Sequence, residues 1–122
     1  MNSSQSFKVY PTSVFISEAK KLKKKYPNIG DDFKELSKIL KKDPITGNDH
    51  IGSECYKIRM RISDKGNGES GGARIIINVM VKDKCVYLLS VYDKGSKETI
   101  SDKELKRLLE KKLNPISRNQ KK

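Results

Sequence analysis

Residues 56–62 of the chain read Tyr-Lys-Ile-Arg-Met-Arg-Ile, and this stretch decides the fold that the sequence predicts. Apolar and cationic residues alternate along it, and successive side chains of a β-strand point to opposite faces of a sheet. One face of the predicted strand would carry Tyr56, Ile58, Met60 and Ile62, and the other would carry Lys57, Arg59 and Arg61. Neighbouring like charges repel, so this cationic row (Lys57, Arg59 and Arg61) indicates a surface that binds an anion.

The composition bounds the class of protein and of partner. A length of 122 residues is typical of one domain, and we expect it to span residues 1–113, followed by a basic tail at 114–122. The net charge is +12, from 27 Lys and Arg against 15 Asp and Glu, which favours nucleic acid, an anionic surface or an acidic protein as the partner. Solvated lysine-rich helix faces are the alternative explanation of this total, but they do not explain the cationic row.

Other features argue against a metal site and a membrane segment. The two cysteines, Cys55 and Cys85, form no Cys-x-x-Cys pair, and His50 is the single histidine, so a zinc site is not expected. The chain has no signal peptide and no apolar run of about 18 residues. We therefore expect a cytoplasmic protein with no metal, no cofactor and no membrane partner.

The N-terminal half predicts a short strand followed by two helices. Residues 7–10 form the strand, and Thr12 or Ser13 can cap the first helix, which ends before Pro27. Asn28 can cap the second helix. At helical spacing, the first helix carries Phe15, Ala19, Leu22 and Tyr26, and the second carries Ile29, Phe33, Leu36 and Leu40. The short link between them predicts a helical hairpin, and we interpret the lysines of the first helix as a solvated face.

The C-terminal half predicts a sheet and a final helix. Residues 43–53 are expected to form a loop. Strands are expected at 56–62, 73–81 and 85–92, joined by a polar, glycine-rich loop and a tight turn. Ser101 and Glu104 form a capping box for the last helix. The predicted fold is α+β in the order β-α-α-β-β-β-α: an antiparallel sheet, with the helices packed on one face and the cationic face open.

One motif in the loop between the predicted strands is misleading. Gly66-Asn67-Gly68-Glu69-Ser70-Gly71 matches the G-x-G-x-x-G pattern of dinucleotide sites. That pattern binds pyrophosphate only where it leads into a helix N-terminus, and here it leads into a predicted strand. A dinucleotide cofactor is therefore not expected, and no Ser-His-Asp or Cys-His set can be assembled around His50.

Several segments together resemble the RelE/HigB branch of the RelE/ParE superfamily, the toxins of bacterial type II toxin–antitoxin systems. They are residues 56–59, 71–74 and 87–94, the Lys-Lys-Tyr-Pro segment, the Asp-Pro-x-x-Gly loop and residues 100–105. The resemblance spans about residues 7–113 and implies a RelE-like fold. It implies an endoribonuclease that cuts mRNA in the ribosomal A site without a metal. The implied partners are a cognate antitoxin, mRNA and the 16S rRNA region of the A site.

The resemblance also implies the site residues. Lys57 and Arg59 match a basic pair on the second strand of the family, and Arg74 matches an arginine at the start of the third. Lys94 falls near a basic position after the last strand, and Tyr92 lies in a HigB-like Tyr-x-Lys segment. These five residues are the expected catalytic set, with Arg61 and Lys65 expected to bind RNA.

The chemistry of RNA cleavage suits such a set. Attack by the 2′-OH builds negative charge at the phosphorus, which fixed arginines stabilise. The 2′-OH also needs a base and the leaving oxygen an acid, for which Lys57 and Tyr92 are candidates, although Tyr92 could instead stack on a base. The family's late C-terminal tyrosine is absent, so the acid–base roles stay open. A ParE-like inhibitor of DNA gyrase and a non-catalytic RNA-binding protein remain alternatives.

Overall fold

The computed structural model describes residues 6–65, 71–95 and 99–112. Along the chain the elements are β1 (Lys8–Pro11), α1 (Ser13–Lys25), α2 (Ile29–Lys42), β2 (Asp49–Gly52), β3 (Cys55–Met60), the 3₁₀ turn η2 (Ser63–Lys65), β4 (Ala73–Met80), β5 (Cys85–Asp93) and α3 (Asp102–Lys111). This confirms the predicted α+β fold, with β2 as an additional strand. The predicted basic tail at 114–122 and residues 66–70 of the glycine-rich pattern lie outside the described residues.

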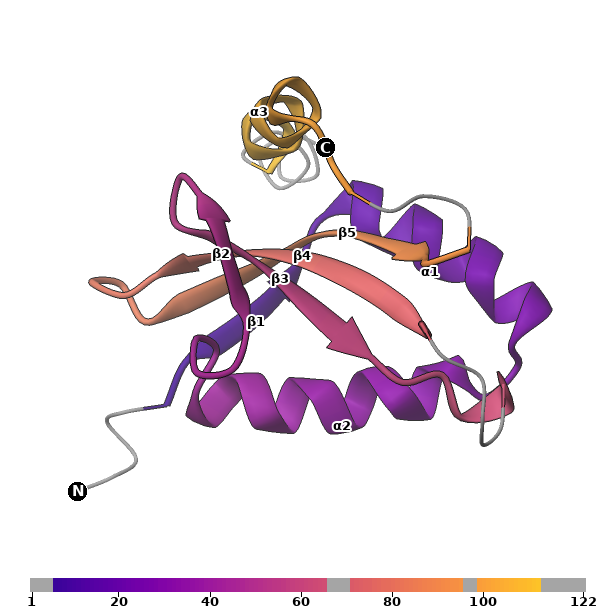
Figure 1. Ribbon diagram of the computed structural model, residues 1–122. Helices are drawn as coiled ribbons and strands as arrows, with labels where there is room; N and C mark the ends of the chain where they lie inside the picture. Colours follow the sequence, from indigo (N-terminus) through magenta and orange to yellow (C-terminus); the bar gives the residue numbers. More distant parts are fainter. Residues whose placement is uncertain (1–5, 66–70, 96–98, 113–122) are drawn as a thin grey trace, which may run out of the picture.

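The five strands form one sheet in the order β1-β5-β4-β3-β2 (Figure 1). The chain from β2 to β5 is an antiparallel meander, as the short connections predict. β1 pairs with β5 in parallel, in the register from Lys8 opposite Cys85 to Pro11 opposite Leu88. The first half of β5 therefore has a strand on both sides, whereas its second half has β4 alone.

One core lies between the sheet and the pair formed by α1 and α2. It contains the apolar side of residues 56–62, with Ile58, Met60 and Ile62 buried, and this confirms the predicted alternation. The helices contribute Phe15, Tyr26, Ile29, Leu36 and Leu40 to this core. The rings of Phe15 and Phe33 meet edge to face with centroids 5.4 Å apart, which joins α1 to α2.

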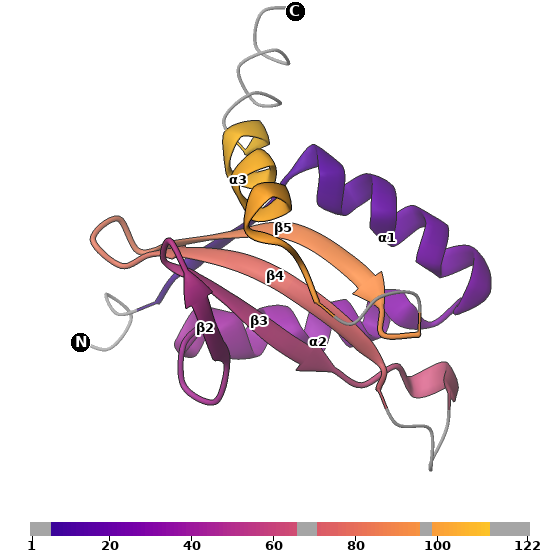
Figure 2. The same ribbon diagram turned by 45° about the horizontal axis from the view of Figure 1, so that its top comes forward.

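A second, smaller core lies on the opposite face, and α3 covers it (Figures 1 and 2). Its buried members are Cys55, Ile76, Leu89, Tyr92, Leu105 and Leu108. The prediction that all helices pack on one face, leaving the other open, is therefore wrong. The physical reason is that β3, β4 and β5 each place an apolar side chain on the cationic face, and α3 removes this apolar surface from water. The part left open is the end of the face that carries the arginines.

The loop predicted at residues 43–53 is also partly wrong, because Asp49–Gly52 forms β2 and pairs with β3. The turn between them lacks the glycine pair that signals a hairpin: Ser53 and Glu54 themselves have φ of 53° and 60°. The predicted Asn28 cap differs too. Helix α2 begins after Asn28, but the Asn28 side chain makes no capping hydrogen bond and donates to Asp64 instead, at 2.8 Å.

Two other predicted caps are confirmed. The Thr12 hydroxyl accepts a hydrogen bond from the Phe15 amide at 3.3 Å, and the Ser101 hydroxyl accepts one from the Glu104 amide at 3.1 Å. These contacts satisfy amide groups that a helix N-terminus leaves without partners, and so fix where α1 and α3 begin. None of the helices in the described ranges is long and apolar enough to span a bilayer.

Candidate functional site

The register of the sheet places the predicted site residues side by side on the face that carries α3. Arg59 of β3 lies opposite Arg74 of β4, which in turn lies opposite Tyr92 of β5. Cross-strand partners project from the same face, so these three side chains form one row across the sheet. In the adjacent row, Lys57 lies opposite Ile76. The structure thus brings together residues that are up to 35 positions apart in the chain.

The arginine pair (Arg59 and Arg74) carries charge that no ion pair among the described residues neutralises. Within the described ranges, no acidic side chain forms an ion pair with either arginine or with Lys57. Two like charges opposite each other on a sheet repel, and Arg74 is only 8% exposed, so water screens it poorly. An anion bound between the two guanidinium groups would relieve both costs.

Arg74 is held in place by the backbone of its own loop. Its Nη1 donates to the carbonyl oxygens of Gly71 and Ala73. Carbonyl oxygens orient the guanidinium without cancelling its charge, unlike a carboxylate. The remaining N–H groups of the planar fork stay available for an anion with oxygen atoms at matching spacing.

A cavity of about 340 Å³ opens beside the arginine pair, and we call it the arginine cavity. It is lined by Arg59, Met60, Arg61, Ile62, Lys65, Gly71, Gly72 and Arg74. Its shape depends on Gly72, which has φ of +54° and whose missing Cβ would lie 2.3 Å from the carbonyl oxygen of Met60. Only glycine lets the start of β4 approach the end of β3 this closely, and that approach aligns the arginines.

Lys94 also reaches this part of the molecule. A Cβ on Gly71 would lie 2.9 Å from Cδ of Lys94, so the aliphatic stem of the lysine passes directly over the glycine. The Lys94 amide donates to the Gly72 carbonyl at 3.0 Å, which fixes the backbone on which the lysine stands. The structure therefore places the predicted Lys94 beside the arginine cavity, although Lys94 does not line it.

The other predicted residues differ in their exposure. Arg61 is exposed and lines the arginine cavity just beyond the end of β3. Lys57 is half-buried and lies one row away from the arginine pair. Tyr92 is only 6% exposed, because it packs in the core beneath α3 with Leu105. Tyr92 does not line the arginine cavity, so contact between its ring and a ligand bound there requires the packing beneath α3 to change.

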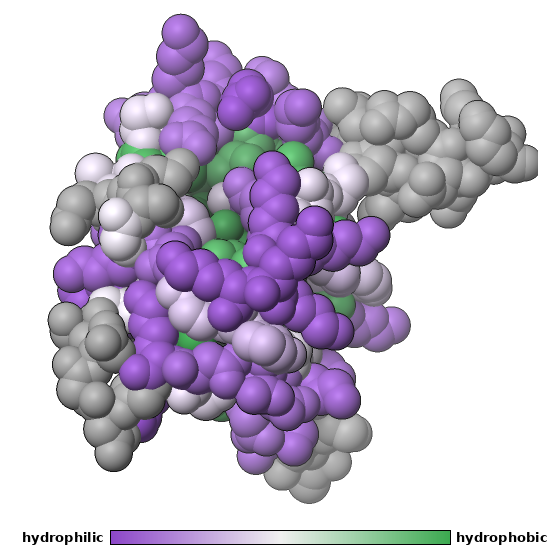
Figure 3. All heavy atoms as spheres, turned by 90° about the vertical axis from the view of Figure 1, so that its right-hand side faces the viewer, coloured by the Kyte–Doolittle hydropathy of each residue, from purple (hydrophilic) through white to green (hydrophobic). Residues whose placement is uncertain are grey.

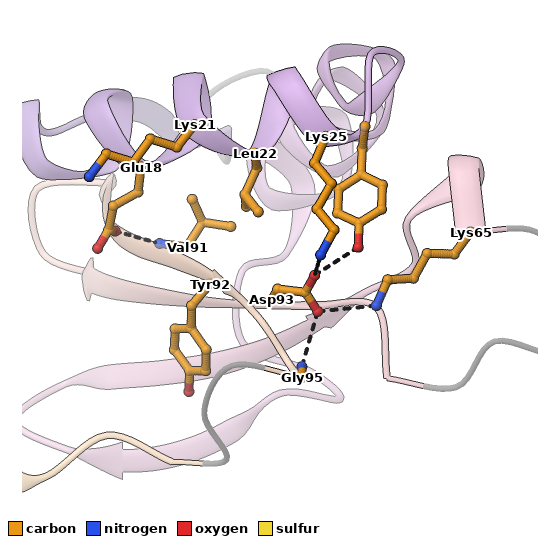
Figure 4. A pocket seen from close by; sticks show the side chains of 10 residues that line it. Glu18, Lys21, Leu22, Lys25, Lys65, Val91, Tyr92, Asp93 and Gly95 are labelled. Carbon is orange, nitrogen blue, oxygen red and sulfur yellow. Dashed lines mark hydrogen bonds and ion pairs between the residues drawn. The ribbon is translucent and has the colours of Figure 1, made fainter.

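A larger cavity of about 840 Å³, the α1 cleft, lies between α1 and the end of β5 (Figure 4). It is lined by Glu18, Lys21, Leu22, Lys25, Tyr26, Lys65, Val91, Tyr92, Asp93 and Gly95. Figure 3 shows this end of the molecule, where hydrophilic side chains cover most of the surface and apolar ones show only between them. The carboxylates of the cleft already form hydrogen bonds or ion pairs within the protein. They are therefore less available to bind a ligand than the arginine pair is.

The carboxylates of Glu18 and Asp93 in the α1 cleft both have hydrogen-bonding partners within the protein. Oε1 of Glu18 accepts from the hydroxyl of Ser90 at 2.8 Å and from the amide of Val91 at 3.0 Å. Asp93 accepts from the hydroxyl of Tyr26 at 2.8 Å and forms ion pairs with Lys65 at 3.1 Å and Lys25 at 3.8 Å. The cleft is thus a set of contacts between elements, and we take the arginine cavity as the candidate functional site.

The environment of Asp93 sets its charge. Partial burial raises the pKa of the carboxyl group, but hydrogen bonds from the Gly95 amide, the Tyr26 hydroxyl and Lys65 outweigh it and hold the pKa at about 2. The carboxylate is therefore ionised at neutral pH and cannot donate a proton there. In return, burial and the contact with Asp93 raise the pKa of the Tyr26 phenol.

The lowered pKa of Asp93 predicts acid sensitivity. A carboxyl group with a folded pKa of about 2 and an ordinary unfolded pKa contributes stability above about pH 4, and this contribution disappears as the pH falls towards 2. The expected size is about 2 kcal/mol. Urea unfolding of the wild type and of Asp93→Asn, each at about pH 7 and pH 2.5, measures it. The wild type should be the more stable at neutral pH, and the difference should shrink in acid.

A matched control for this measurement is Glu35→Gln, which removes one partner of the exposed Glu35–Lys38 pair on α2. Both of these side chains are about 70% exposed, at 73% and 71%, so the control should change stability little at either pH. A difference between wild type and Asp93→Asn that stays constant from neutral to acid pH would contradict the low pKa.

Several important residues had no signal in the sequence. Asp93 and Tyr26 are 67 positions apart, and Glu18 and Ser90 are 72 apart, so no local pattern links them. Asp32 and Asp64 are further examples. Asp32 accepts from the amide and hydroxyl of Ser63, and Asp64 from the amide and side chain of Asn28. Together these contacts attach η2 to the start of α2. No group of three or more His, Cys, Asp or Glu within the described ranges could hold a metal ion.

Comparison with known proteins identifies the family. A family described as the RelE toxin of the RelE/RelB toxin–antitoxin system matches residues 7–120. The fold is similar to a free-state mutant of the E. coli toxin RelE, with a TM-score of 0.56 and 18% identity over 91% of this chain and 98% of that chain. It is also similar to the isolated E. coli RelE toxin, with a TM-score of 0.52 and 21% identity over 86% and 98%. No curated protein matches the chain.

The two solved structures share the fold, and the family match covers the cationic row, the arginine pair and the cavity beside them. Membership also implies a cognate antitoxin as a partner. This chain belongs to the RelE toxin family of the RelE/RelB toxin–antitoxin system.

Proposed function

We propose that this protein is a ribosome-dependent endoribonuclease of the cytoplasm, which stops translation by cleaving mRNA in the A site without a metal or other cofactor. The observation that carries the proposal is the arginine pair. Arg59 and Arg74 lie opposite each other on two neighbouring strands and line a cavity, and neither forms an ion pair with a carboxylate in the described part of the chain. A nucleic-acid phosphate would supply the negative charge that the arginine pair lacks, and membership of the RelE toxin family favours RNA as that nucleic acid.

The chemical step needs little more than an oriented phosphate. The 2′-oxygen attacks the adjacent phosphorus, the bond to the 5′-oxygen breaks, and the products are a 2′,3′-cyclic phosphate and a 5′-hydroxyl. Negative charge grows on the non-bridging oxygens in the transition state. Two fixed guanidinium groups bind that state better than the substrate, which lowers the barrier.

Proton transfer in the proposed mechanism falls to side chains beside the arginine pair. Lys57 lies in the row next to the arginine pair, and Lys94 stands over Gly71, so both ammonium groups are placed to help neutralise or protonate a departing oxygen. Tyr92 lies in the same row as the arginines but beneath α3. In the proposed mechanism Lys57 and Lys94 act at the phosphate, and Tyr92 participates once bound RNA has shifted α3.

The test is a translating extract to which the purified protein is added. We expect truncated messages whose new 5′ ends cluster at positions occupied by the A site, with no such cuts in naked RNA. Intact mRNA together with reduced gyrase supercoiling would overturn the proposal in favour of a ParE-like function. Intact mRNA that the protein nevertheless binds would indicate a non-catalytic RNA-binding protein.

A further inference from the structure

The carboxylate of Asp93 joins three parts of the chain: the end of α1, the turn η2 and the residues that follow β5 (Figure 4). Oδ2 accepts the hydrogen bond from the Tyr26 hydroxyl, which fixes the end of α1. Oδ1 accepts from the Lys65 ammonium at 3.1 Å and from the Gly95 amide at 3.0 Å. The side chain of Asp93 is 13% exposed, so solvent weakens these contacts little.

Lys65 connects Asp93 to the arginine cavity. It is the residue that the linings of the α1 cleft and the arginine cavity have in common. Its ammonium pairs with Asp93 and lies 5.7 Å from the centre of the Tyr26 ring, and the same residue lines the arginine cavity beside Arg59 and Arg74. The side chain is only 16% exposed, which is unusual for lysine. The ion pair with Asp93 therefore fixes the position of Lys65 in the lining of the arginine cavity.

Lys94 depends on Asp93 in a different way. The Gly95 amide folds back onto Oδ1 of Asp93, so the side chain of Asp93 shapes the turn that contains Lys94. The Lys94 amide then donates to Gly72, and its stem lies over Gly71. One carboxylate thus holds Lys65, which lines the arginine cavity, and the turn that carries Lys94 over Gly71.

We propose that Asp93 is a positioning residue of the endoribonuclease: it fixes Lys65 and Lys94 at the two sides of the arginine cavity without contacting RNA itself. The inference rests on the proposed function. Its physical basis is the direction of the carboxylate, which points into the α1 cleft and away from the arginine pair. The negative charge therefore orients two cations while it adds no repulsion at the site where a phosphate would bind.

The test compares Asp93→Asn with the wild type in cleavage of a ribosome-bound message. Asparagine keeps the size and can still accept from Gly95, but it cannot form the ion pair with Lys65. We expect kcat to fall about 10- to 100-fold with little change in KM, because misplaced groups affect the transition state more than binding. Lys65→Met should cause a similar loss. The double variant should be no slower than the slower single variant, because both changes remove one interaction.

Lys25→Met is the matched control. Lys25 also pairs with Asp93, at 3.8 Å, but it is 69% exposed and lies on α1, away from the arginine cavity. Its loss should leave kcat unchanged. Thermal unfolding of each variant shows whether it is folded at the assay temperature, and if Asp93→Asn is not, Lys65→Met tests the same contact from its other side.

The outcomes distinguish a failure of the positioning role of Asp93 from a failure of the proposed function. A wild type that cuts mRNA while a folded Asp93→Asn cuts equally fast overturns the inference and leaves the proposed function standing. So does a double variant whose loss is the product of the two single losses. A wild type that leaves the message intact overturns the proposed function and the positioning role with it.

Discussion

Arg74→Ala is expected to lower the rate of mRNA cleavage by about 10²- to 10³-fold, the usual effect of removing one group that stabilises transition-state charge. The guanidinium of Arg74 is buried beside Arg59 and forms no ion pair with a carboxylate in the described ranges, so its full charge acts on a bound phosphate. Cells that express the variant should keep growing where wild-type protein arrests them. Rates of truncation of a ribosome-bound message give the quantitative comparison.

Arg74 also donates to Gly71, so a structural effect must be separated from a catalytic one. Arg74→Lys keeps the charge but loses the planar fork, and its rate should lie between those of the wild type and Arg74→Ala. Arg107→Ala removes an exposed arginine of α3 and should leave cleavage unchanged. Full cleavage by a folded Arg74→Ala would show that Arg74 is not part of the site.

Gly72→Ala is expected to cost about 3 kcal/mol of stability, the largest loss that we expect from adding a single methyl group to this protein. The new Cβ would lie 2.3 Å from the Met60 carbonyl oxygen and 3.2 Å from Cα of Arg61, and both are backbone atoms that cannot rotate away. The start of β4 must therefore move away from β3, which also separates Arg59 from Arg74. Urea unfolding measures the stability, and the cleavage assay measures the accompanying loss of activity.

Gly47→Ala is the control that isolates the clash. Gly47 has φ of +84°, so alanine there suffers the strain of a left-handed backbone, but nothing lies within 4 Å of its Cβ position. We expect a loss of about 1 kcal/mol from conformation alone. Equal losses at the two glycines would show that the close approach of Gly72 to Met60 does not matter for the fold.

The alternation in residues 56–62 made the two faces of β3 predictable, because period two specifies which side chains share a face whatever the rest of the sheet does. It placed Arg59 on the cationic side and Ile58 in the core, as observed. The pairing of Arg59 with Arg74 was not predictable from alternation, since register depends on where the connecting loop ends. The resemblance to the RelE/HigB branch supplied Arg74, and the register then placed it.

The burial of Tyr92 shows where sequence reasoning ended. A tyrosine near a strand end gives no sign of whether the next helix folds back over it, as α3 (Asp102–Lys111) does here. The contacts of Asp93 could not be predicted either, because its partners Tyr26 and Lys65 become its neighbours only in the folded protein. β2 escaped prediction because its turn uses Ser53 and Glu54 where glycines are typical.

The contact of Glu18 with β5 has a consequence for solubility. Beyond Leu88, β5 pairs with no strand on its outer side within the described ranges, so its backbone amides would form a template for a strand of another molecule. The Glu18 carboxylate occupies the Val91 amide and, by its charge, repels an approaching acceptor. A single side chain on α1 thus occupies a backbone amide at the unpaired end of the sheet that a strand of another molecule would otherwise use.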